Sequence, residues 1–376
     1  MQHAFVPTAP ETPAENPSQA VNRAVSFYLD PASAWEAMLR DCAAATRSLD
    51  FEQYILNDDE IGKKFLRLFA DKAKKGVKVR LLLDRVGSRS TYASPEIKTI
   101  RANGGQVHYY GGKSWLNVFV PWKWFPRNHA KVMLIDDRIV YIGSVCIDQS
   151  MANWRDTQMR LDGILAEDIK TEFQLTWNNV GERRRFKVFY ASPAEKVWRY
   201  AVHQPRLTPN PIYRELLRRI RHAQKRILLA TPYFVPPWPL RSALRKAVRR
   251  GVKVEVMISG KSDVGIADAV SRSYFPRLLK AGVDIYLYNP DILHTKYAVV
   301  DDEWATIGST NMDYLSLLHN REANVITSDG ETVRILQGHF ENDLKVCEKA
   351  DKAYWTSRPW TFKLAGRMGR LLRRFL

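Results

Sequence analysis

The residues best suited to chemistry in this sequence occur in two copies of one pattern, H-x-K-x4-D. The copies are His129-Lys131-Asp136 and His294-Lys296-Asp301. An imidazole can act as a nucleophile or as a general acid and base, and a lysine can stabilise negative charge. A single H-x-K in a strand is usually incidental, but a duplicated scaffold has no packing reason to keep histidine and lysine together twice. The pattern therefore predicts a catalytic site.

Each copy is followed by further polar residues at matching distances. Ser144 and Ser309 both lie 15 residues after their histidine, and an acid, Asp156 or Glu322, lies 27 or 28 residues after it. A carboxylate that accepts one ring N–H fixes the tautomer of a histidine and stabilises its imidazolium. We therefore expect Asp156 and Glu322 to orient the two histidines.

We expect each motif to lie on a strand, where residues two apart share a face. His129 and Lys131 would then lie side by side, and so would their counterparts in the second copy. The motif aspartates are seven residues from their histidines, so a regular strand turns them to the opposite face. We interpret Asp136 and Asp301 as residues that support the motif, not as direct participants in the reaction.

The two patterns end two copies of a longer repeat. The expected strands are 48–55, 76–84 and 104–110 in the first copy, and 226–235, 251–259 and 281–288 in the second. The stretches between them have helical apolar spacing and end at glycine, and the strands are continuous aliphatic runs, as buried parallel strands require. We expect two α/β lobes related by an approximate twofold, with the matching motifs facing each other.

The length of the chain also favours two lobes. With 376 residues it exceeds the size at which single hydrophobic cores stop growing, about 250–300 residues. We predict a disordered tail over 1–24, lobes over 25–190 and 205–350, and a basic amphipathic tail over 351–376. Several prolines place the linker between the lobes near 190–210.

The formal charge of +18 favours an anionic partner, either a phospholipid surface, a nucleic acid or a phosphorylated substrate. The three cysteines, Cys42, Cys146 and Cys347, lie far apart, which predicts neither a disulfide framework nor a zinc site and fits a reducing, cytosol-facing location. The N-terminus lacks a basic start and an apolar run, so we do not interpret it as a signal peptide. No stretch approaches the ~20 apolar residues that span a membrane, so we expect any membrane contact to be peripheral.

Two segments bear on the choice between lipid and nucleic acid. The first copy has 12 extra residues, 115–126, which are rich in tryptophan beside lysine, as is typical of a membrane interface. In the tail, 362–376, an apolar helical stripe lies opposite a basic face, as in helices that lie on membranes. The stripe is Leu364, Met368, Leu371, Leu372 and Phe375. The alternatives are an insert folded onto the core, and a basic helix that packs on the domain or binds RNA.

The duplicated motifs resemble those of the phospholipase D superfamily, and the resemblance runs from about residue 25 to 350. Within that superfamily the sequence is more similar to bacterial cardiolipin synthases than to the nucleases or kinases that share the fold. The stretches that carry this similarity are DDEIGKKFL (58–66), NWRDTQMRLDG (153–163), TPYFVPP (231–237), SGKSD (259–263) and GSTNMDYLS (308–316). The resemblance implies lobes of mixed β-sheet flanked by helices, related by a pseudo-twofold, with the active site at their interface.

The resemblance also implies a two-step exchange at a phosphodiester. One histidine attacks phosphorus and forms a phosphohistidine while the other protonates the departing alcohol, and the second histidine then activates an incoming alcohol or water. By analogy we assign His129 as the nucleophile and His294 as the acid and base. The side chains implied to hold the phosphoryl oxygens are Lys131, Lys296, Ser144, Ser309 and Asn311. Neither a metal nor a cofactor is implied.

One position departs from the family pattern. Cys146 stands where the second copy has Asn311, and a thiol is a poor hydrogen-bond donor. The first lobe would then bind phosphate less well than the second, unless Cys146 is a small buried filler.

We predict a membrane-associated phosphatidyl transferase, a cardiolipin synthase that joins phosphatidylglycerol to a second phospholipid on the cytoplasmic face of the membrane. We expect 115–126 and 362–376 to contact the anionic membrane surface. The tail favours lipid over nucleic acid as the substrate. The alternatives are a hydrolytic phospholipase D that releases phosphatidic acid and a phospholipase D-type nuclease, whose bases could stack on the same tryptophans.

Overall fold

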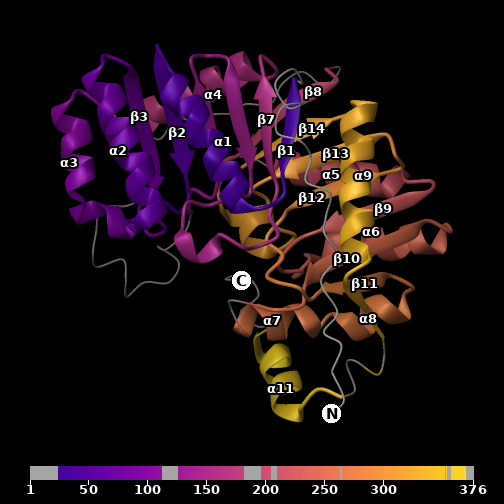
Figure 1. Cartoon of the computed structure of the whole chain (residues 1–376). Coiled ribbons are helices and arrows are strands. Elements are labelled where there is room, and N and C mark those ends of the chain that lie inside the picture. Colours follow the sequence, from indigo (N-terminus) through magenta and orange to yellow (C-terminus); the bar gives the residue numbers. More distant parts are fainter. Residues whose placement is uncertain are drawn as a thin grey trace, which may run out of the picture.

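A computed structural model describes residues 24–111, 126–181, 196–204, 210–262, 265–351, 353 and 357–369. It consists of two lobes, each built on one mixed β-sheet with helices against it (Figure 1). The strand order is β1-β7-β6-β5-β2-β3-β4 in the first sheet and β15-β11-β10-β9-β12-β13-β14-β8 in the second. The predicted α/β architecture of two similar lobes is confirmed.

The elements follow the repeat seen in the sequence. Those of the first lobe are β1 (Val25–Tyr28), α1 (Pro31–Ala44), β2 (Ser48–Gln53), α2 (Glu60–Lys74), β3 (Lys78–Asp84), η2 (Arg89–Ala93), α3 (Pro95–Ala102), β4 (Gln106–Tyr110), β5 (Val132–Ile135), β6 (Ile139–Gly143), η5 (Gln149–Met151), β7 (Gln158–Asp162) and α4 (Ala166–Gly181). Those of the second lobe are β8 (Trp198–His203), α5 (Pro211–His222), β9 (Arg226–Ala230), α6 (Trp238–Arg249), β10 (Lys253–Ser259), α7 (Gly265–Arg272), α8 (Phe275–Lys280), β11 (Asp284–Tyr288), β12 (Tyr297–Val300), β13 (Trp304–Gly308), η6 (Leu315–His319), β14 (Glu322–Thr327), α9 (Gly330–Leu344) and β15 (Cys347–Ala350). A further helix, α11 (Trp360–Gly369), follows.

Each sheet combines a parallel half and an antiparallel half. In the first lobe β2, β3 and β4 run parallel, and β5 lies antiparallel to β2 and to β6. In the second lobe β9, β10 and β11 run parallel, and β12 lies antiparallel to β9 and to β13. Each H-x-K motif therefore enters its sheet next to the first parallel strand, at the same place in both lobes.

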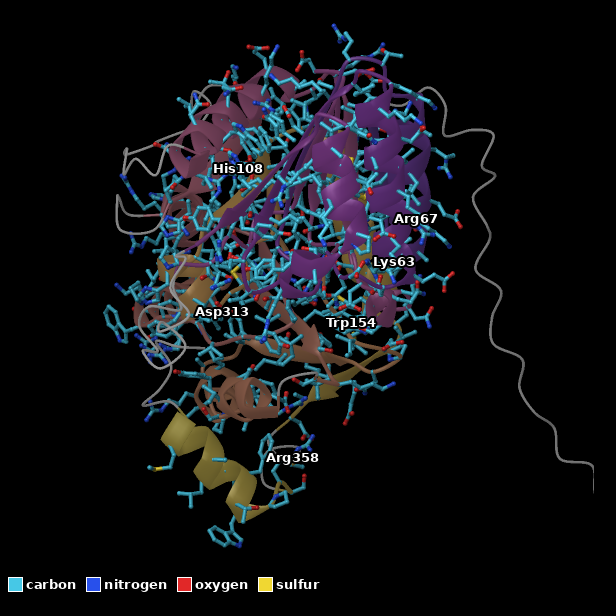
Figure 2. All side chains as sticks on the ribbon, turned by 90° about the vertical axis from the view of Figure 1, so that its left-hand side faces the viewer. Lys63, Arg67, His108, Trp154, Asp313 and Arg358 are labelled. Atoms are coloured by element: carbon cyan, nitrogen blue, oxygen red, sulfur yellow. The ribbon has the colours of Figure 1, made fainter. Side chains whose placement is uncertain are left out.

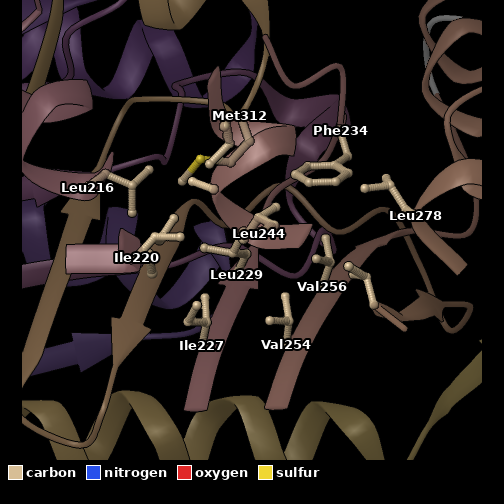
Figure 3. Close-up of a cluster of buried hydrophobic side chains, with 14 of the residues drawn as sticks. Leu216, Ile220, Ile227, Leu229, Phe234, Leu244, Val254, Val256, Leu278 and Met312 are labelled. Carbon is tan, nitrogen blue, oxygen red and sulfur yellow. The ribbon is translucent and has the colours of Figure 1, made fainter. Parts of the chain in front are cut away.

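Alternation along the strands gives every sheet two buried faces. Val132 and Leu134 of β5 lie in a core that includes Tyr297 and Val299 of β12, so the two lobes share this core. The opposite face of the first sheet packs against α1, α2 and α3. The opposite face of the second sheet packs against α5 and α6, where residues such as Ile227 and Val254 meet Leu216 and Leu244 (Figure 3).

The boundaries of the lobes differ from the sequence prediction at one point. Residues 198–203, which we placed in the linker, form β8, and this strand pairs with β14 at the edge of the second sheet. Its register matches Glu322 with His203, so the strand adjoins one of the predicted site residues. The segment 112–125, which contains most of the tryptophan-rich insert, and residues 370–376 of the tail lie outside the described residues.

Candidate active site

The histidine of the first motif is paired with the acid of the second lobe. His129 Nδ1 lies 3.0 Å from both carboxylate oxygens of Glu322, and the carboxylate is completely buried. The ring of Tyr54 lies edge-on to the imidazole, with 4.8 Å between the ring centroids. A neutral His129 that donates its Nδ1 hydrogen to Glu322 has a free lone pair on Nε2.

The histidine of the second motif is paired in the same way with the acid of the first lobe. His294 Nδ1 lies 2.7 Å from Asp156 Oδ2, and Asp156 is 1% exposed. The ring of Trp154 lies 5.4 Å from the imidazole between centroids. Figure 2 labels Trp154 at the level where the two lobes meet. Neither histidine therefore has its acid on its own lobe.

Backbone hydrogen bonds between the lobes hold these pairs in register. The His129 amide donates to the Arg321 carbonyl over 2.9 Å, and the His294 amide donates to the Arg155 carbonyl over 2.7 Å. Isolated bridges pair Asn128 with Arg321 and Arg155 with Leu293. The motif residues before β5 and β12 are therefore extended, as predicted, but they bridge to the other lobe before they join their own sheet.

The motif lysines are also buried beside the histidines. Lys131 is 1% exposed, and its Nζ donates to the His129 carbonyl over 2.8 Å and lies 5.2 Å from the centroid of the Tyr54 ring. Lys296 is 1% exposed and donates to the His294 carbonyl. Since Tyr54 contacts both His129 and Lys131, these two side chains lie on the same side of the chain.

The two serines contact the acids that face the histidines. Ser144 Oγ donates to Asp156, and Ser309 Oγ donates to Glu322. Each serine follows a glycine that lets the neighbouring strand of its sheet approach closely. A Cβ at Gly143 would lie 2.4 Å from the Thr157 carbonyl oxygen, and a Cβ at Gly308 would lie 2.3 Å from the Ala323 carbonyl oxygen. The serines thus lie within the acid networks, and a contact with phosphate remains a prediction.

The position held by Asn311 in the second lobe and by Cys146 in the first has different contacts in the two lobes. Asn311 hydrogen-bonds to the buried carboxyl of Asp313, and its Oδ1 has no partner in the described part of the chain. Cys146 is 2% exposed, and its carbonyl accepts a hydrogen bond from Trp35 Nε1 over 2.8 Å. The side chain of Cys146 offers no amide hydrogen at this place, so the two halves of the site are not equivalent.

The motif aspartates lie away from the histidines, in the turns that follow β5 and β12. Both have positive φ, 52° for Asp136 and 56° for Asp301. The carboxylate of Asp136 accepts backbone N–H groups of Thr46, Arg47 and Ser48, and that of Asp301 accepts those of Gln224, Lys225 and Arg226. These bonds join each hairpin to the chain that enters the neighbouring parallel strand.

Burial sets the charges of the site. It lowers the pKa of His294 to about 4, assisted by the charge of Lys296 and opposed by Asp156. It also lowers the pKa of His129, and Glu322 opposes this shift. Burial would raise the pKa of Asp156, but the neighbouring His294 lowers it to about 2. At neutral pH without substrate, both imidazoles are therefore neutral and Asp156 is ionised.

Comparison with known proteins gives the family. The family described as "Cardiolipin synthase, PLD-like domain" matches residues 38–177 and 216–344. Among curated proteins, the cardiolipin synthase of Clostridium perfringens strain SM101 is 31% identical over 354 residues, which are 89% of this chain and 73% of that protein. The major cardiolipin synthase of Bacillus subtilis strain 168 is 31% identical over 93% of this chain and 75% of its own length. This chain belongs to the cardiolipin synthase family of phospholipase D-like proteins.

Family membership makes the chain a phospholipase D superfamily enzyme of the phosphatidyltransferase class. Two solved structures share its fold at 13% identity. They are phosphatidylserine synthase of Haemophilus influenzae, with a TM-score of 0.72 over 94% of this chain and 95% of that one, and polyphosphate kinase of Porphyromonas gingivalis, with a TM-score of 0.64 over 99% of this chain and 57% of that one.

For this member of the cardiolipin synthase family, the sequence prediction missed two residues. Arg155 and Arg321 precede the orienting acids and contribute the carbonyls that bind the histidine amides. The signal was present, because both acids follow an arginine, in WRDTQ and in NREAN.

Among the described residues no helix is long and apolar enough to span a membrane, and no three or more His, Cys, Asp or Glu side chains are grouped as metal ligands.

Proposed function

We propose that this enzyme is a membrane-associated cardiolipin synthase that transfers a phosphatidyl group through a phosphohistidine. The single observation that carries the mechanism is the crossed pairing of His129 with Glu322 and of His294 with Asp156. It provides two imidazoles with fixed tautomers at one interface between the lobes, as a double displacement requires. The cardiolipin synthase names of the relatives support the choice of product.

In the first step His129 Nε2 attacks the phosphorus of phosphatidylglycerol. The bond from phosphorus to the glycerol headgroup oxygen breaks, and His294 gives a proton to that oxygen, so glycerol leaves and a phosphatidyl-histidine forms. In the second step His294 takes the proton of a hydroxyl on a second phosphatidylglycerol. That oxygen attacks phosphorus, the bond to His129 breaks, and cardiolipin is released.

The charges of the site suit this order. A nucleophile must be neutral, and burial keeps the pKa of His129 below its ordinary value. His294 must be an imidazolium, with a proton on Nε2 as well as on Nδ1, when the headgroup leaves. The anionic phosphodiester stabilises the imidazolium as it enters, and ionised Asp156 stabilises it from the other side. Lys131 and Lys296, with Asn311, would bind the phosphoryl oxygens and stabilise their charge in the transition state.

Helix α11 supports the membrane part of the proposal. It packs on α7 through Gly366, where a Cβ would lie 2.4 Å from the Ala269 carbonyl oxygen. Its opposite side presents Trp360, Leu364 and Met368, which are 73%, 46% and 57% exposed. Figure 1 shows α11 at the end of the second lobe, beyond α7, and Figure 2 labels Arg358 beside it. An apolar row with basic residues near it suits an anionic lipid surface.

The product formed from labelled phosphatidylglycerol tests the proposal. The purified protein is incubated with vesicles of labelled phosphatidylglycerol, alone and with phosphatidylethanolamine, and in parallel with labelled single-stranded DNA. We expect labelled cardiolipin and glycerol from phosphatidylglycerol alone. Phosphatidic acid as the main product would show a hydrolase, and cleaved DNA without lipid turnover would show a nuclease.

A further inference from the structure

Each orienting acid follows an arginine that is buried between the lobes. Arg321 precedes Glu322 and is 0% exposed, and Arg155 precedes Asp156 and is 8% exposed. Neighbouring residues of an extended chain point to opposite faces. Ala323, two residues after Arg321, lies in the core that the two lobes share. Each acid therefore faces its histidine while its arginine faces the opposite way, toward the shared core.

Arg321 is clamped by two carboxylates of the first lobe. Its Nε lies 2.8 Å from Glu52 Oε1 and its Nη2 lies 3.1 Å from Glu52 Oε2, so the contact is bidentate. The same Nη2 lies 2.9 Å from Glu172 Oε2. Glu52 belongs to β2 and Glu172 to α4, and both are buried. The arginine that precedes Glu322 is thus fixed to the lobe that carries His129.

Arg155 crosses the interface in the other direction. Its Nε lies 2.9 Å from Asp343 Oδ1, and its Nη2 lies 2.8 Å from Asp343 Oδ2. Asp343 belongs to α9, and α9 is part of the second lobe, the lobe that carries His294. The two arginines are therefore related by the pseudo-twofold, but Arg321 has two carboxylate partners and Arg155 has one.

We propose that Arg321 and Arg155 are positioning residues, and that each controls a different step of the reaction. Arg321 fixes the pair of His129 and Glu322, and Arg155 fixes the pair of His294 and Asp156. The bidentate pair of Arg321 with Glu52 sets both distance and orientation. Arg155 is held to Asp343 by one hydrogen bond from Nε and a second ion contact from Nη2. In both cases the carbonyl of the same arginine binds the histidine amide. Misplacement of a reacting group by about 1 Å can cost roughly 100-fold in rate.

The assignment of steps rests on the proposed function, in which His129 is the nucleophile and His294 the acid and base. Loss of the Arg321 clamp should slow formation of the phosphohistidine, whatever the leaving group. Loss of the Arg155 clamp should slow protonation of the headgroup and activation of the acceptor. A phosphatidyl ester of p-nitrophenol separates the effects of the two arginines. Since p-nitrophenolate leaves without a proton, formation of the phosphohistidine from this ester does not need His294 as an acid.

The variants are designed to leave no unpaired buried charge, because removal of one partner of a buried ion pair is strongly destabilising. The first combines Arg321→Met with Glu52→Gln and Glu172→Gln, and the second combines Arg155→Met with Asp343→Asn. Arg321→Lys and Arg155→Lys serve as milder variants, since lysine keeps the charge without the guanidinium geometry.

The matched control removes a third buried ion pair. It combines Arg80→Met with Asp50→Asn, whose side chains are 6% and 2% exposed and lie 2.6 Å apart. Both residues lie within the first lobe, and neither adjoins a histidine or its acid in the chain.

Rapid-quench kinetics with the p-nitrophenyl ester and the full chain test the inference. We expect the Arg155 variant to keep its burst of p-nitrophenol, accumulate phosphoenzyme and lose roughly 10- to 100-fold in steady-state turnover. The Arg321 variant should lose a similar factor in the burst rate and accumulate no phosphoenzyme. The lysine variants should show the same two patterns with smaller factors, and the control should stay within about twofold of wild type.

Equal losses of burst and turnover in both variants, or losses no larger than in the control, would overturn the inference alone. A wild-type protein that forms no phosphoenzyme would overturn the proposed function and this inference with it.

Discussion

Lys296 carries a charge that depends on pH near the physiological range. Burial lowers its pKa to about 8, although Asp156 opposes the shift. A lysine is cationic below its pKa, so a phosphoryl group held by Lys296 should lose this contact as pH rises through about 8. We expect kcat/KM to fall on the alkaline side of that value.

Substitution identifies the group responsible for this alkaline limb. Arginine stays charged above pH 12, so Lys296→Arg should remove the limb even if its larger head lowers the rate. The measurement is the pH profile of kcat/KM for wild type and variant, with Lys131→Arg as the matched comparison. An unchanged limb in Lys296→Arg would assign it to another group.

The sequence predicted the candidate reactive residues, but it could not pair them. Each acid lies 27 or 28 residues after the histidine of its own lobe, whereas its contact in the structure is with the other histidine. The contacting residues are separated by 193 positions for His129 and Glu322 and by 138 for His294 and Asp156. Spacing describes a repeat, and it carries no information on how two repeats face each other.

At the scale of elements, the hairpin turns after β5 and β12 explain why each motif ends in aspartate. Asp136 and Asp301 adopt positive φ, which aspartate tolerates better than most residues, and each carboxylate binds backbone N–H groups of the segment before β2 or β9. The side chain thus holds two strands of the sheet together without contacting a histidine.

This arrangement predicts an effect on stability and little effect on chemistry. Asp301→Ala removes the acceptor of three backbone N–H groups and should lower the free energy of unfolding by about 2–3 kcal/mol. Asp301→Asn tolerates the same φ and keeps one acceptor, so it should cost about 1 kcal/mol. Denaturant unfolding gives both values. The folded variants should keep kcat within about twofold, and a loss comparable to that of a histidine variant would place the aspartate in the reaction.

Periodicity predicted most strands well, because buried parallel strands are continuous aliphatic runs. It failed at β8, where Trp198–His203 lies among prolines and was assigned to the linker. In the structure β8 is the counterpart of β1, because each precedes a helix and the first parallel strand and pairs at the edge of its sheet. The repeat predicted from the sequence began only at residues 48 and 226, so it included neither strand. Its pairing with β14 is a tertiary contact that the local sequence does not specify.

At the scale of the whole molecule, the two lobes meet at one interface with a shared core, while α11 lies beyond α7 at the far end of the second lobe (Figure 1). The apolar row of α11 is exposed although the helix is packed on α7 through glycine. The sequence predicted an apolar stripe that includes Leu364 and Met368, and it could not show which side of the helix would face the lobe. In the structure Leu364 and Met368, the two stripe residues that it describes, face outward.

Replacement of this row should weaken membrane binding. Trp360→Ser with Leu364→Gln and Met368→Gln removes apolar surface that would enter the lipid interface, and we expect roughly a 10- to 100-fold loss in vesicle affinity. Sedimentation with phosphatidylglycerol vesicles measures it. The matched control is Leu175→Gln with Val197→Gln, which are 42% and 50% exposed elsewhere and should bind as wild type does. Equal binding of all three proteins would make α11 a structural helix.

The most direct test of the central claim is to trap the phosphohistidine. The wild-type, His129→Ala and His294→Ala proteins are incubated with an acyl-labelled phosphatidyl ester of p-nitrophenol, denatured and analysed for bound label. We predict label on His129 of the His294→Ala variant, because this nucleophile can displace p-nitrophenolate but cannot be discharged without its partner, and no label on His129→Ala. Label on His129→Ala alone would reverse the two roles. Label on neither variant would contradict the account.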